Sequence, residues 1–214
     1  MTAAALRRRR PVADRPLEII AVLLLGVATL GSAWCGYQAT RWNSEESDFA
    51  REASDDRVEA SRLFGLAVQA VSYDSNMAAQ YAQAVSEGNE RLKQFYRESL
   101  IRPQFLPVLD RWEAELAAGA TGVSNLLQDE EYLAAQLADY QGVQDSAEVA
   151  LEKSIEAGEN SEKFVQLTLV LAGALFFAGV TTSFRWALAR VMLLVGSSLL
   201  IAYAASQLVD LPLT

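Results

Sequence analysis

The sequence predicts an all-α integral membrane protein, with three transmembrane helices and an extracytoplasmic helical bundle or coiled-coil domain between spans one and two. Three runs carry no charged residue: 22 residues from Ile19 to Thr40, 21 from Phe164 to Phe184 and 19 from Val191 to Val209. A helix needs about 20 apolar residues to cross the hydrocarbon core of a bilayer. The stretch from Arg41 to Lys163 is polar instead, and its 24 acidic and 11 basic residues give it a formal charge of −13 within a chain of −9.

The N-terminal segment before the first run is basic and is expected to stay in the cytoplasm, because basic residues that flank a span are retained on that side. A cleaved signal peptide would also begin with basic residues. However, its apolar region is shorter than 22 residues, and its cleavage site needs small residues where Trp34 stands. The first run is therefore interpreted as an uncleaved anchor. The arginines of the segment are Arg7, Arg8, Arg9, Arg10 and Arg15.

The link between the second and third runs is short and basic, with Arg185 and Arg190 at its ends. Three crossings place this link on the same side as the N-terminus, so both basic segments predict the same orientation. A re-entrant hairpin is the alternative for the third run, but its 19 apolar residues favour a full span. The predicted segments are a cytoplasmic N-terminus (1–18), span one (19–40), an acidic extracytoplasmic domain (41–163), span two (164–184), a cytoplasmic loop (185–190), span three (191–209) and an extracytoplasmic tail (210–214).

Aromatic residues at the ends of the spans are expected to lie at the membrane interface, where amphipathic rings favour the headgroup region. These residues are Trp34, Tyr37 and Trp42 for the first span, Trp186 beside the inner loop, and Tyr203 near the outer end of the third span. Small residues are expected to pack the spans, because they let helix backbones approach closely. The candidates are Ala28, Ser32 and Gly36 in the first span, and Gly173, Ala174, Ala178 and Gly179 in the second.

Transport coupled to protons or ions is disfavoured, because no Asp, Glu, Lys or Arg lies inside the three runs and coupled transporters usually keep ionisable groups there. An oligomeric pore or transporter accessory remains an alternative. Its polar lining would come from Thr29, Ser32, Gln38, Ser197 and Ser198.

The missing residue types exclude much enzyme chemistry. Without histidine, the chain lacks the commonest general base and zinc ligand. Its single Cys35 lies in the first apolar run, where a thiol behaves as a small hydrophobe. Gly119-Ala-Thr-Gly122 lacks the Lys and Ser/Thr of a phosphate-binding loop. No catalytic, cofactor-binding or metal-binding residue is predicted, and the acidity argues against nucleic acid as a partner.

Acidic clusters of the polar region lack the spacing of a calcium-binding loop and are interpreted as solvated faces or helix starts. An enzyme that uses Glu45, Glu46 and Asp48 at the membrane surface is the weakest alternative. Basic side chains near residue 90 are expected to form ion pairs along their own helix. These are Arg91, Lys93 and Arg97, with Glu87, Glu90 and Glu98 as their partners.

The polar region is predicted to be helical, because good helix formers dominate it and apolar positions recur at close to 3.5-residue spacing. Asn43 and Ser44 either cap a new helix or lie within a continuation of the first span. Interruptions are predicted at Asp74-Ser75-Asn76, at Glu87-Gly88-Asn89, at Pro103–Pro107 and in a loop at Gly119–Asn125. With the first interruption the region forms a bundle of four helices, which we prefer. Without it, one helix would span residues 44–100.

Two stretches at the ends of the spans resemble a known group. They are Ala33-Trp-Cys-Gly-Tyr-Gln-Ala-Thr-Arg-Trp42, and Leu175-Phe-Phe-Ala-Gly-Val180 followed by Phe184-Arg185; Leu211-Pro212 then follows the third span. The chain is similar here to uncharacterised bacterial three-span membrane proteins that share a domain of unknown function. The resemblance lies mainly in the spans. It implies a bacterial inner membrane and supplies no catalytic residue.

The sequence therefore predicts a non-enzymatic inner-membrane protein that acts through protein–protein interaction, as a scaffold, assembly factor or sensory accessory. Its acidic helical domain would make the contact outside the cytoplasm. The expected partners are the lipid bilayer and either further copies of the chain in a homo-oligomer or another membrane protein.

Overall fold

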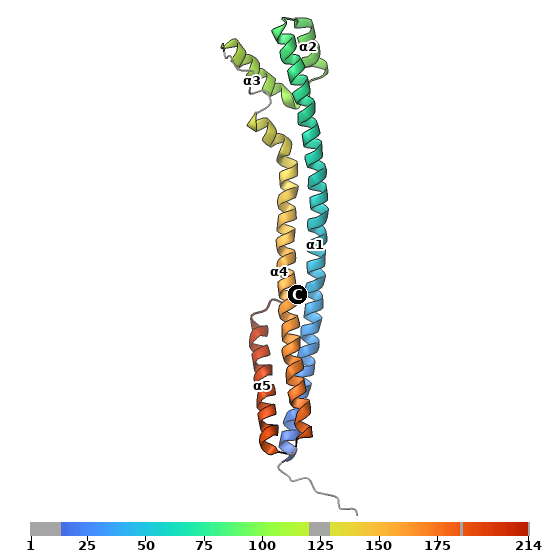
Figure 1. The fold of residues 1–214 in the computed structure, drawn as a ribbon, viewed down its shortest axis with the longest axis vertical. Coiled ribbons are helices and arrows are strands. Elements are labelled where there is room, and N and C mark those ends of the chain that lie inside the picture. The colour runs from blue at the N-terminus through green and yellow to red at the C-terminus, as the bar shows by residue number, and fades with distance from the viewer. Residues whose placement is uncertain (1–13, 120–128, 185, 214) are drawn as a thin grey trace, which may run out of the picture. The chain divides into compact units, whose positions relative to one another are not determined.

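The computed structural model describes residues 14–119, 129–184 and 186–213, and the regular elements of these residues are all helices (Figure 1). Three of the helices, α1, α4 and α5, contain a stretch long and apolar enough to cross a membrane. This confirms the predicted all-helical chain with three long apolar helices. The elements are α1 (Asp14–Ser86), α2 (Glu90–Ser99), the 3-10 turn η1 (Pro103–Phe105), α3 (Leu106–Ala117), α4 (Glu130–Val180), the 3-10 turn η2 (Thr181–Ser183) and α5 (Ala187–Val209).

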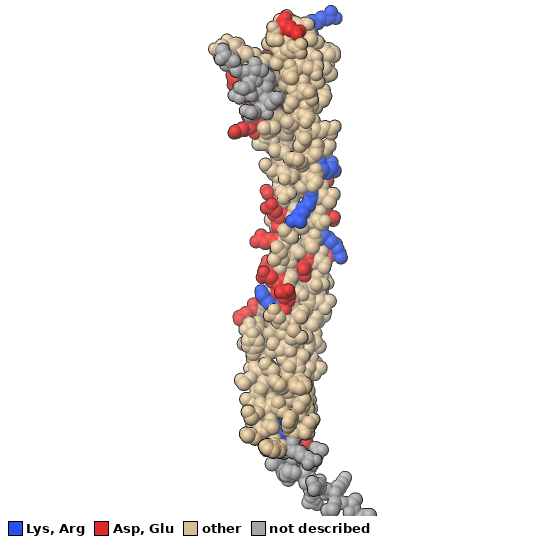
Figure 2. Space-filling model, viewed as in Figure 1, with Lys and Arg blue, Asp and Glu red and all other residues tan. Residues whose placement is uncertain are grey.

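Helices α1 and α4 each contribute to two compact units. The apolar unit takes its described residues from Met1–Ala50 and Glu152–Thr214, and so contains all of α5. The acidic unit is Arg51–Leu151, which has 17 acidic and 8 basic residues and contains α2 and α3. On the face in Figure 2, the part of the apolar unit that contains α5 presents almost only uncharged side chains.

In the apolar unit, α4 runs antiparallel to both α1 and α5. At one end Arg190 of α5 lies 3.8 Å from the carboxylate of Glu18 of α1. At the other end the indole Nε1 of Trp42 donates to the carbonyl oxygen of Pro212, at 3.3 Å. Between the two ends lies a core to which all three helices contribute: Cys35, Ala39, Phe164, Leu167, Leu171 and Ala204.

Buried positions of the apolar unit recur at intervals of seven residues. They are Ala21, Ala28 and Cys35 on α1, Ala157, Phe164, Leu171 and Ala178 on α4, and Arg190, Ser197 and Ala204 on α5. Seven residues are almost two helical turns, so such a series keeps one face of each helix toward its neighbours. Most of these residues are small, which lets the helix backbones lie close together.

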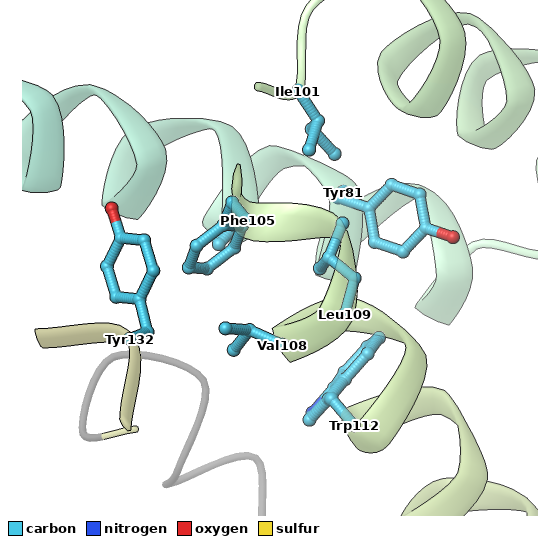
Figure 3. Close-up of a cluster of buried hydrophobic side chains, with 8 residues drawn as sticks. Tyr81, Ile101, Phe105, Val108, Leu109, Trp112 and Tyr132 are labelled. Carbon is cyan, nitrogen blue, oxygen red and sulfur yellow. The ribbon is translucent and has the colours of Figure 1, made fainter. Parts of the chain in front are cut away.

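The acidic unit has a separate core that joins α1, α3 and the start of α4 (Figure 3). Tyr81 packs edge-on against Trp112, with ring centroids 6.3 Å apart. Phe105 does the same with Tyr132 at 5.1 Å. The buried residues of this core are Ala78, Tyr81, Ile101, Phe105, Val108, Leu109, Trp112 and Tyr132.

The interruption predicted at Asp74-Ser75-Asn76 is wrong, because α1 continues through these residues to Ser86. Turn-forming side chains do not end a helix when tertiary contacts favour its continuation, and here Asp74 is buried in such contacts. The alternative helix over 44–100 is also not observed, since α1 ends before Glu87. Asn43 and Ser44 lie inside α1, so the first apolar run continues into the polar region as one helix.

The other predicted interruptions fall at helix ends. Gly88 has a φ of +66°, and the side chain of Asn89 accepts from the amide of Leu92 to cap α2. Pro103 and Pro107 lie in the first turns of η1 and α3, where a missing amide proton costs nothing. Gly119, with a φ of +85°, follows α3, and residues 120–125 of the predicted loop lie outside the described residues. Helix α5 begins at Ala187, so it includes most of the predicted loop at 185–190.

Candidate functional site

A buried carboxylate, Asp74, joins three segments of the acidic unit. Its side chain is 1% exposed. Arg102, just before η1, donates to it from Nε at 2.9 Å and from Nη2 at 2.5 Å. The Tyr132 hydroxyl of α4 donates to the same carboxylate, and Arg102 also donates to Gln136 at 3.2 Å. We call these four residues the Asp74 cluster. It fixes the chain before η1 against both long helices.

Contacts within the Asp74 cluster raise the pKa of both Tyr132 and Arg102. Burial raises the pKa of Tyr132, and its hydrogen bond to Asp74 raises it further. The hydrogen bonds to Asp74 also raise the pKa of Arg102, against the opposing effect of burial. Both shifts favour the protonated forms of Tyr132 and Arg102, which are the forms that donate to Asp74. The arrangement links the segment before η1 to α1 and α4 through one buried side chain.

A second polar cluster joins α2 to α3 around Glu113. The Tyr81 hydroxyl donates to Glu113 at 2.5 Å, and Lys93 lies 3.0 Å from the same carboxylate. Arg97 pairs with Asp110 and lies 3.5 Å from Glu113. The ion pairs predicted along α2 are thus replaced, for Lys93 and Arg97, by pairs to α3. The reason is that both cations lie on the face of α2 that packs against the neighbouring helix.

Next to the Asp74 cluster, the surface of the acidic unit contains a groove of about 450 Å³. We call it the α1 groove, and it is lined by Leu66, Gln69, Ala70, Tyr73 and Arg102. Leu66 and Tyr73 remain 50% and 40% exposed, although both are large apolar side chains. The Tyr73 hydroxyl donates to the carbonyl of Leu100 at 2.8 Å, which fixes its ring in place. The groove is shallow and open, and two of its five lining side chains, Tyr73 and Arg102, are held by hydrogen bonds.

In the apolar unit, hydroxyl groups connect the helices. Ser161 donates to the carbonyl of Ala39 at 3.0 Å, and Ser197 to the carbonyl of Ala174 at 2.9 Å. Among the residues considered for a pore lining, Thr29 and Ser198 donate within their own helices. Serine and threonine satisfy their hydroxyl groups in this way in apolar surroundings. Ser32 is half-buried and Gln38 is buried.

The small residues proposed for helix packing occupy two kinds of position. Ala28, Ala174 and Ala178 are fully buried. Ser32 and Gly36 are half-buried, and a Cβ at Gly36 would meet no atom within 4 Å. A Cβ at Gly173 would lie 3.5 Å from Leu200, and one at Gly179 4.0 Å from Leu25. Sequence reasoning missed Gly31, the closest approach among the glycines of the three apolar stretches, where a Cβ would lie 3.1 Å from Leu171.

The predicted topology determinants are described only in part. Arg190 is buried beside Glu18. Arg7, Arg8, Arg9, Arg10 and Arg185, and the side chain of Arg15, lie outside the described residues. Of the predicted interface aromatics, Trp34, Tyr37, Trp186 and Tyr203 are exposed, and Trp42 is half-buried against Pro212.

The acidic residues weighed as a catalytic group, Glu45, Glu46 and Asp48, lie on α1 of the apolar unit. Glu46 fits into the notch left by Gly158 of α4, where a Cβ would lie 3.1 Å from its carboxylate carbon. Within the part of the chain that the structure describes, no group of three or more Asp, Glu, Cys or His side chains is placed to hold a metal ion.

Comparison of the chain with protein-family models, with curated proteins and with solved structures gives no match. The resemblance to bacterial three-span proteins therefore stays a prediction.

Proposed function

We propose that this protein is a three-span membrane protein whose acidic unit lies outside the cytoplasm and acts there by binding another protein through the α1 groove. The antiparallel arrangement of the apolar unit supports the topology. The Glu18–Arg190 end of the unit adjoins both basic segments of the sequence, and the Trp42–Pro212 end adjoins the acidic polar region. A basic end and an acidic end are what the positive-inside rule expects of a cytoplasmic and an extracytoplasmic side.

Helix packing in both units is compatible with such an anchor. In the acidic unit, α1 has a seven-residue series of its own, with Ala53, Ala60 and Ala67 buried; it is offset from the first series, because Ala53 follows Cys35 by 18 residues. We infer that α1 and α4 pair as an antiparallel coiled coil, because a sustained seven-residue repeat favours a left-handed supercoil. Small residues in such a seam give a stiff support for a binding surface.

The observation that carries the binding proposal is the exposure of Leu66 and Tyr73 in a shallow groove where hydrogen bonds hold Tyr73 and Arg102 in place. Exposed apolar side chains around a concave, ordered surface are typical of contact sites for partners. The Asp74 cluster already holds Arg102 in the groove wall, which lowers the conformational entropy lost there when a partner binds. Binding, rather than catalysis, is the role that such a preformed surface supports best.

Charge favours a partner of another kind over a second copy. The acidic unit carries 17 acidic and 8 basic residues, so two copies side by side would repel each other. A membrane protein with a basic and partly apolar extracytoplasmic face would be attracted to it. A homo-oligomer is the competing arrangement, and the mass of a crosslinked adduct distinguishes it from a complex with another protein.

Orientation is tested first, by labelling single cysteines in a Cys35→Ala background with a membrane-impermeant maleimide. Ala118→Cys, at the exposed end of α3, is expected to react from outside the cytoplasm. Ser183→Cys, at the end of the second apolar stretch, is expected to react only after the membrane is opened. Labelling of Ala118→Cys only from the cytoplasmic side would overturn the proposed topology.

Binding is tested by placing the photo-crosslinking residue p-benzoylphenylalanine at Leu66 of the full chain in its membrane. Val149, on α4 of the same unit and 51% exposed, provides the matched control position. We expect one adduct of defined mass from Leu66, none from Val149, and loss of the adduct in a Tyr73→Asp variant. An adduct of twice the chain's mass would replace the foreign partner by a second copy. Equal crosslinking from both positions would overturn the groove as the contact site.

A further inference from the structure

A polar cleft lies between α4 and α5 of the apolar unit, at the end marked by Trp42 and Pro212. Its volume is about 320 Å³. Helix α4 supplies Lys163, Gln166, Leu167 and Val170, and the end of α5 with the residues after it supplies Tyr203, Gln207, Asp210 and Leu211. Neither the helix packing nor the α1 groove accounts for these polar side chains.

The lining of the cleft changes from charged to apolar along the helix axes. Lys163 and Asp210 form one end, since each borders an uncharged run of the sequence. Val170 lies seven residues further along α4, and Tyr203 seven residues back along α5, which is about 10 Å at 1.5 Å per residue. Gln166 and Gln207 lie between the two levels. The lining is thus polar at the Trp42–Pro212 end and largely apolar further along the two helices.

The two charged side chains of the cleft are not used in ion pairs among the described residues. Lys163 lies 3.5 Å from the amide oxygen of Asn160, and the backbone amide of Asp210 donates to the carbonyl of Gln207. The Lys163 ammonium and the Asp210 carboxylate thus border one cleft with opposite charges. A ligand that carries both an anion and a cation matches this pair better than a ligand with one charge.

We propose that this cleft binds the phosphoethanolamine headgroup of a membrane phospholipid. Lys163 and the glutamine amides would donate to the phosphate, and the carboxylate of Asp210 would accept from the primary ammonium. Leu167 and Val170 would contact the glycerol and the first acyl carbons. The inference rests on the proposed membrane insertion, which places this end of the spans at headgroup depth.

The chemistry of the cleft also selects against other common headgroups. A phosphoglycerol headgroup carries only negative charge, so it would leave Asp210 near the phosphate without a cation. A phosphocholine headgroup has a quaternary ammonium, which has no proton to donate to the carboxylate. Free phosphoethanolamine has the same primary ammonium, and a phosphate monoester with more negative charge than the phosphodiester of the lipid, but offers nothing to the apolar part of the cleft.

The test uses the full chain in nanodiscs that contain equal amounts of phosphatidylethanolamine, phosphatidylglycerol and phosphatidylcholine. Lipids that stay bound after gentle release are identified by native mass spectrometry. We expect several-fold enrichment of phosphatidylethanolamine, abolished in Asp210→Asn, and less retained lipid of every class in Lys163→Gln. Lys153→Gln, on the same helix but outside the cleft, is the control and is expected to keep the enrichment. Excess free phosphoethanolamine is expected not to displace the lipid.

Equal retention of the three lipids, or enrichment unchanged by Asp210→Asn, would overturn the headgroup assignment. Displacement by free phosphoethanolamine would show that the acyl part is not recognised and would overturn the assignment to a lipid. Insertion is followed separately, by resistance of the chain to alkaline extraction from membranes. A chain that resists extraction but shows no lipid preference refutes only this inference, whereas an extracted chain refutes the proposed function.

Discussion

The apolar and acidic units are built from the same two long helices, yet different contacts hold them together. In the apolar unit, buried positions such as Ala28 and Ala174 are small, and Ser197 donates across to a backbone carbonyl. In the acidic unit, aromatic rings and charged side chains fill the space between the helices. The difference follows the surroundings that we propose for each unit. Lipid offers little hydrophobic driving force for packing, so close backbone contact matters there, whereas water rewards the burial of large rings.

The comparison predicts where each unit is most sensitive. The acidic unit should depend on single polar groups whose loss leaves a buried partner unsatisfied. The apolar unit should tolerate the loss of a polar group but not an increase in volume between its helices. Four changes test this contrast.

The largest effect is expected for Asp74→Ala, which removes the carboxylate that Arg102 and Tyr132 share. Breaking a buried ion pair costs about 3 kcal/mol or somewhat more, because the remaining charge loses its partner. Urea unfolding of the full chain in mild detergent measures this through Trp112 fluorescence, after Trp34, Trp42 and Trp186 are each changed to Phe. Trp112 lies in the core of the acidic unit and reports on it directly.

Asp139→Ala is the matched control for Asp74→Ala, since Asp139 is an exposed acid on α4 of the same unit. It is expected to change the unfolding free energy by less than about 0.5 kcal/mol. If Asp74→Ala is equally mild, the Asp74 cluster does not hold the unit together.

The next effect concerns volume in the apolar unit. Ala174 is fully buried and accepts from Ser197 through its carbonyl, so Ala174→Leu would push α4 and α5 apart. Overpacking of this kind costs about 1–3 kcal/mol. Titration with SDS, followed by the helical signal in circular dichroism, is expected to show earlier loss of structure. Ala172→Leu, two residues away on an exposed position, should leave the titration unchanged; a similar shift in both variants would contradict close packing at Ala174.

How far the sequence predicted these features depends on the range of the interaction. The three apolar stretches follow from composition alone, because crossing a bilayer requires a fixed number of apolar residues. Breaks at Gly88 and at the prolines follow from local backbone chemistry. Asp74 was misinterpreted because its effect is not local. A turn-forming residue stayed in a helix when Arg102, 28 residues later, neutralised its buried charge.

A signal for Asp74 was nevertheless present in the sequence. Asp74 follows Ala60 and Ala67 at seven-residue intervals, and Tyr81 continues the series, so it lies on the buried face of α1. A charged residue at such a position implies a buried partner. The sequence alone does not show that Arg102 is the residue that pairs with Asp74, because the turn between α2 and η1 is what brings Arg102 to Asp74. The α1 groove likewise depends on how that turn packs.

The third change is a change in pH, and we expect the stability of the two units to respond to it differently. Burial opposes ionisation of Glu113, but its contacts with Tyr81 and Lys93 outweigh burial and lower its pKa. Burial also raises the pKa of Asp129, but hydrogen bonds from the Tyr132 amide and from Arg111 outweigh burial and lower it. A carboxyl group whose pKa is lower in the folded than in the unfolded protein stabilises the folded state. This stabilisation is complete when the pH is above the pKa of the unfolded state, near 4, and it is lost as the pH falls through the pKa of the folded state.

We therefore expect the midpoint of urea unfolding, read from Trp112, to be constant from pH 7 to about 5 and to fall below about pH 4. The SDS titration of the apolar stretches should move less over the same range. Glu113→Gln is expected to weaken the pH dependence of the Trp112 signal, since Glu113 can then no longer titrate. A pH profile that is identical in wild type and Glu113→Gln would remove this residue from the explanation.

The smallest effect is expected for Ser197→Ala, which removes the hydrogen bond from α5 to the carbonyl of Ala174. Hydrogen bonds between helices in membranes contribute about 0.6 kcal/mol on average, because the separated helices find other partners. The neighbouring Ser198→Ala is the control, since that hydroxyl donates within its own helix to Leu194. In the SDS titration, Ser197→Ala should cause a slightly earlier transition than Ser198→Ala. A loss in Ser197→Ala as large as that of Asp74→Ala would mean that polar contacts, and not close packing, also hold the apolar unit, and the contrast between the units would fail.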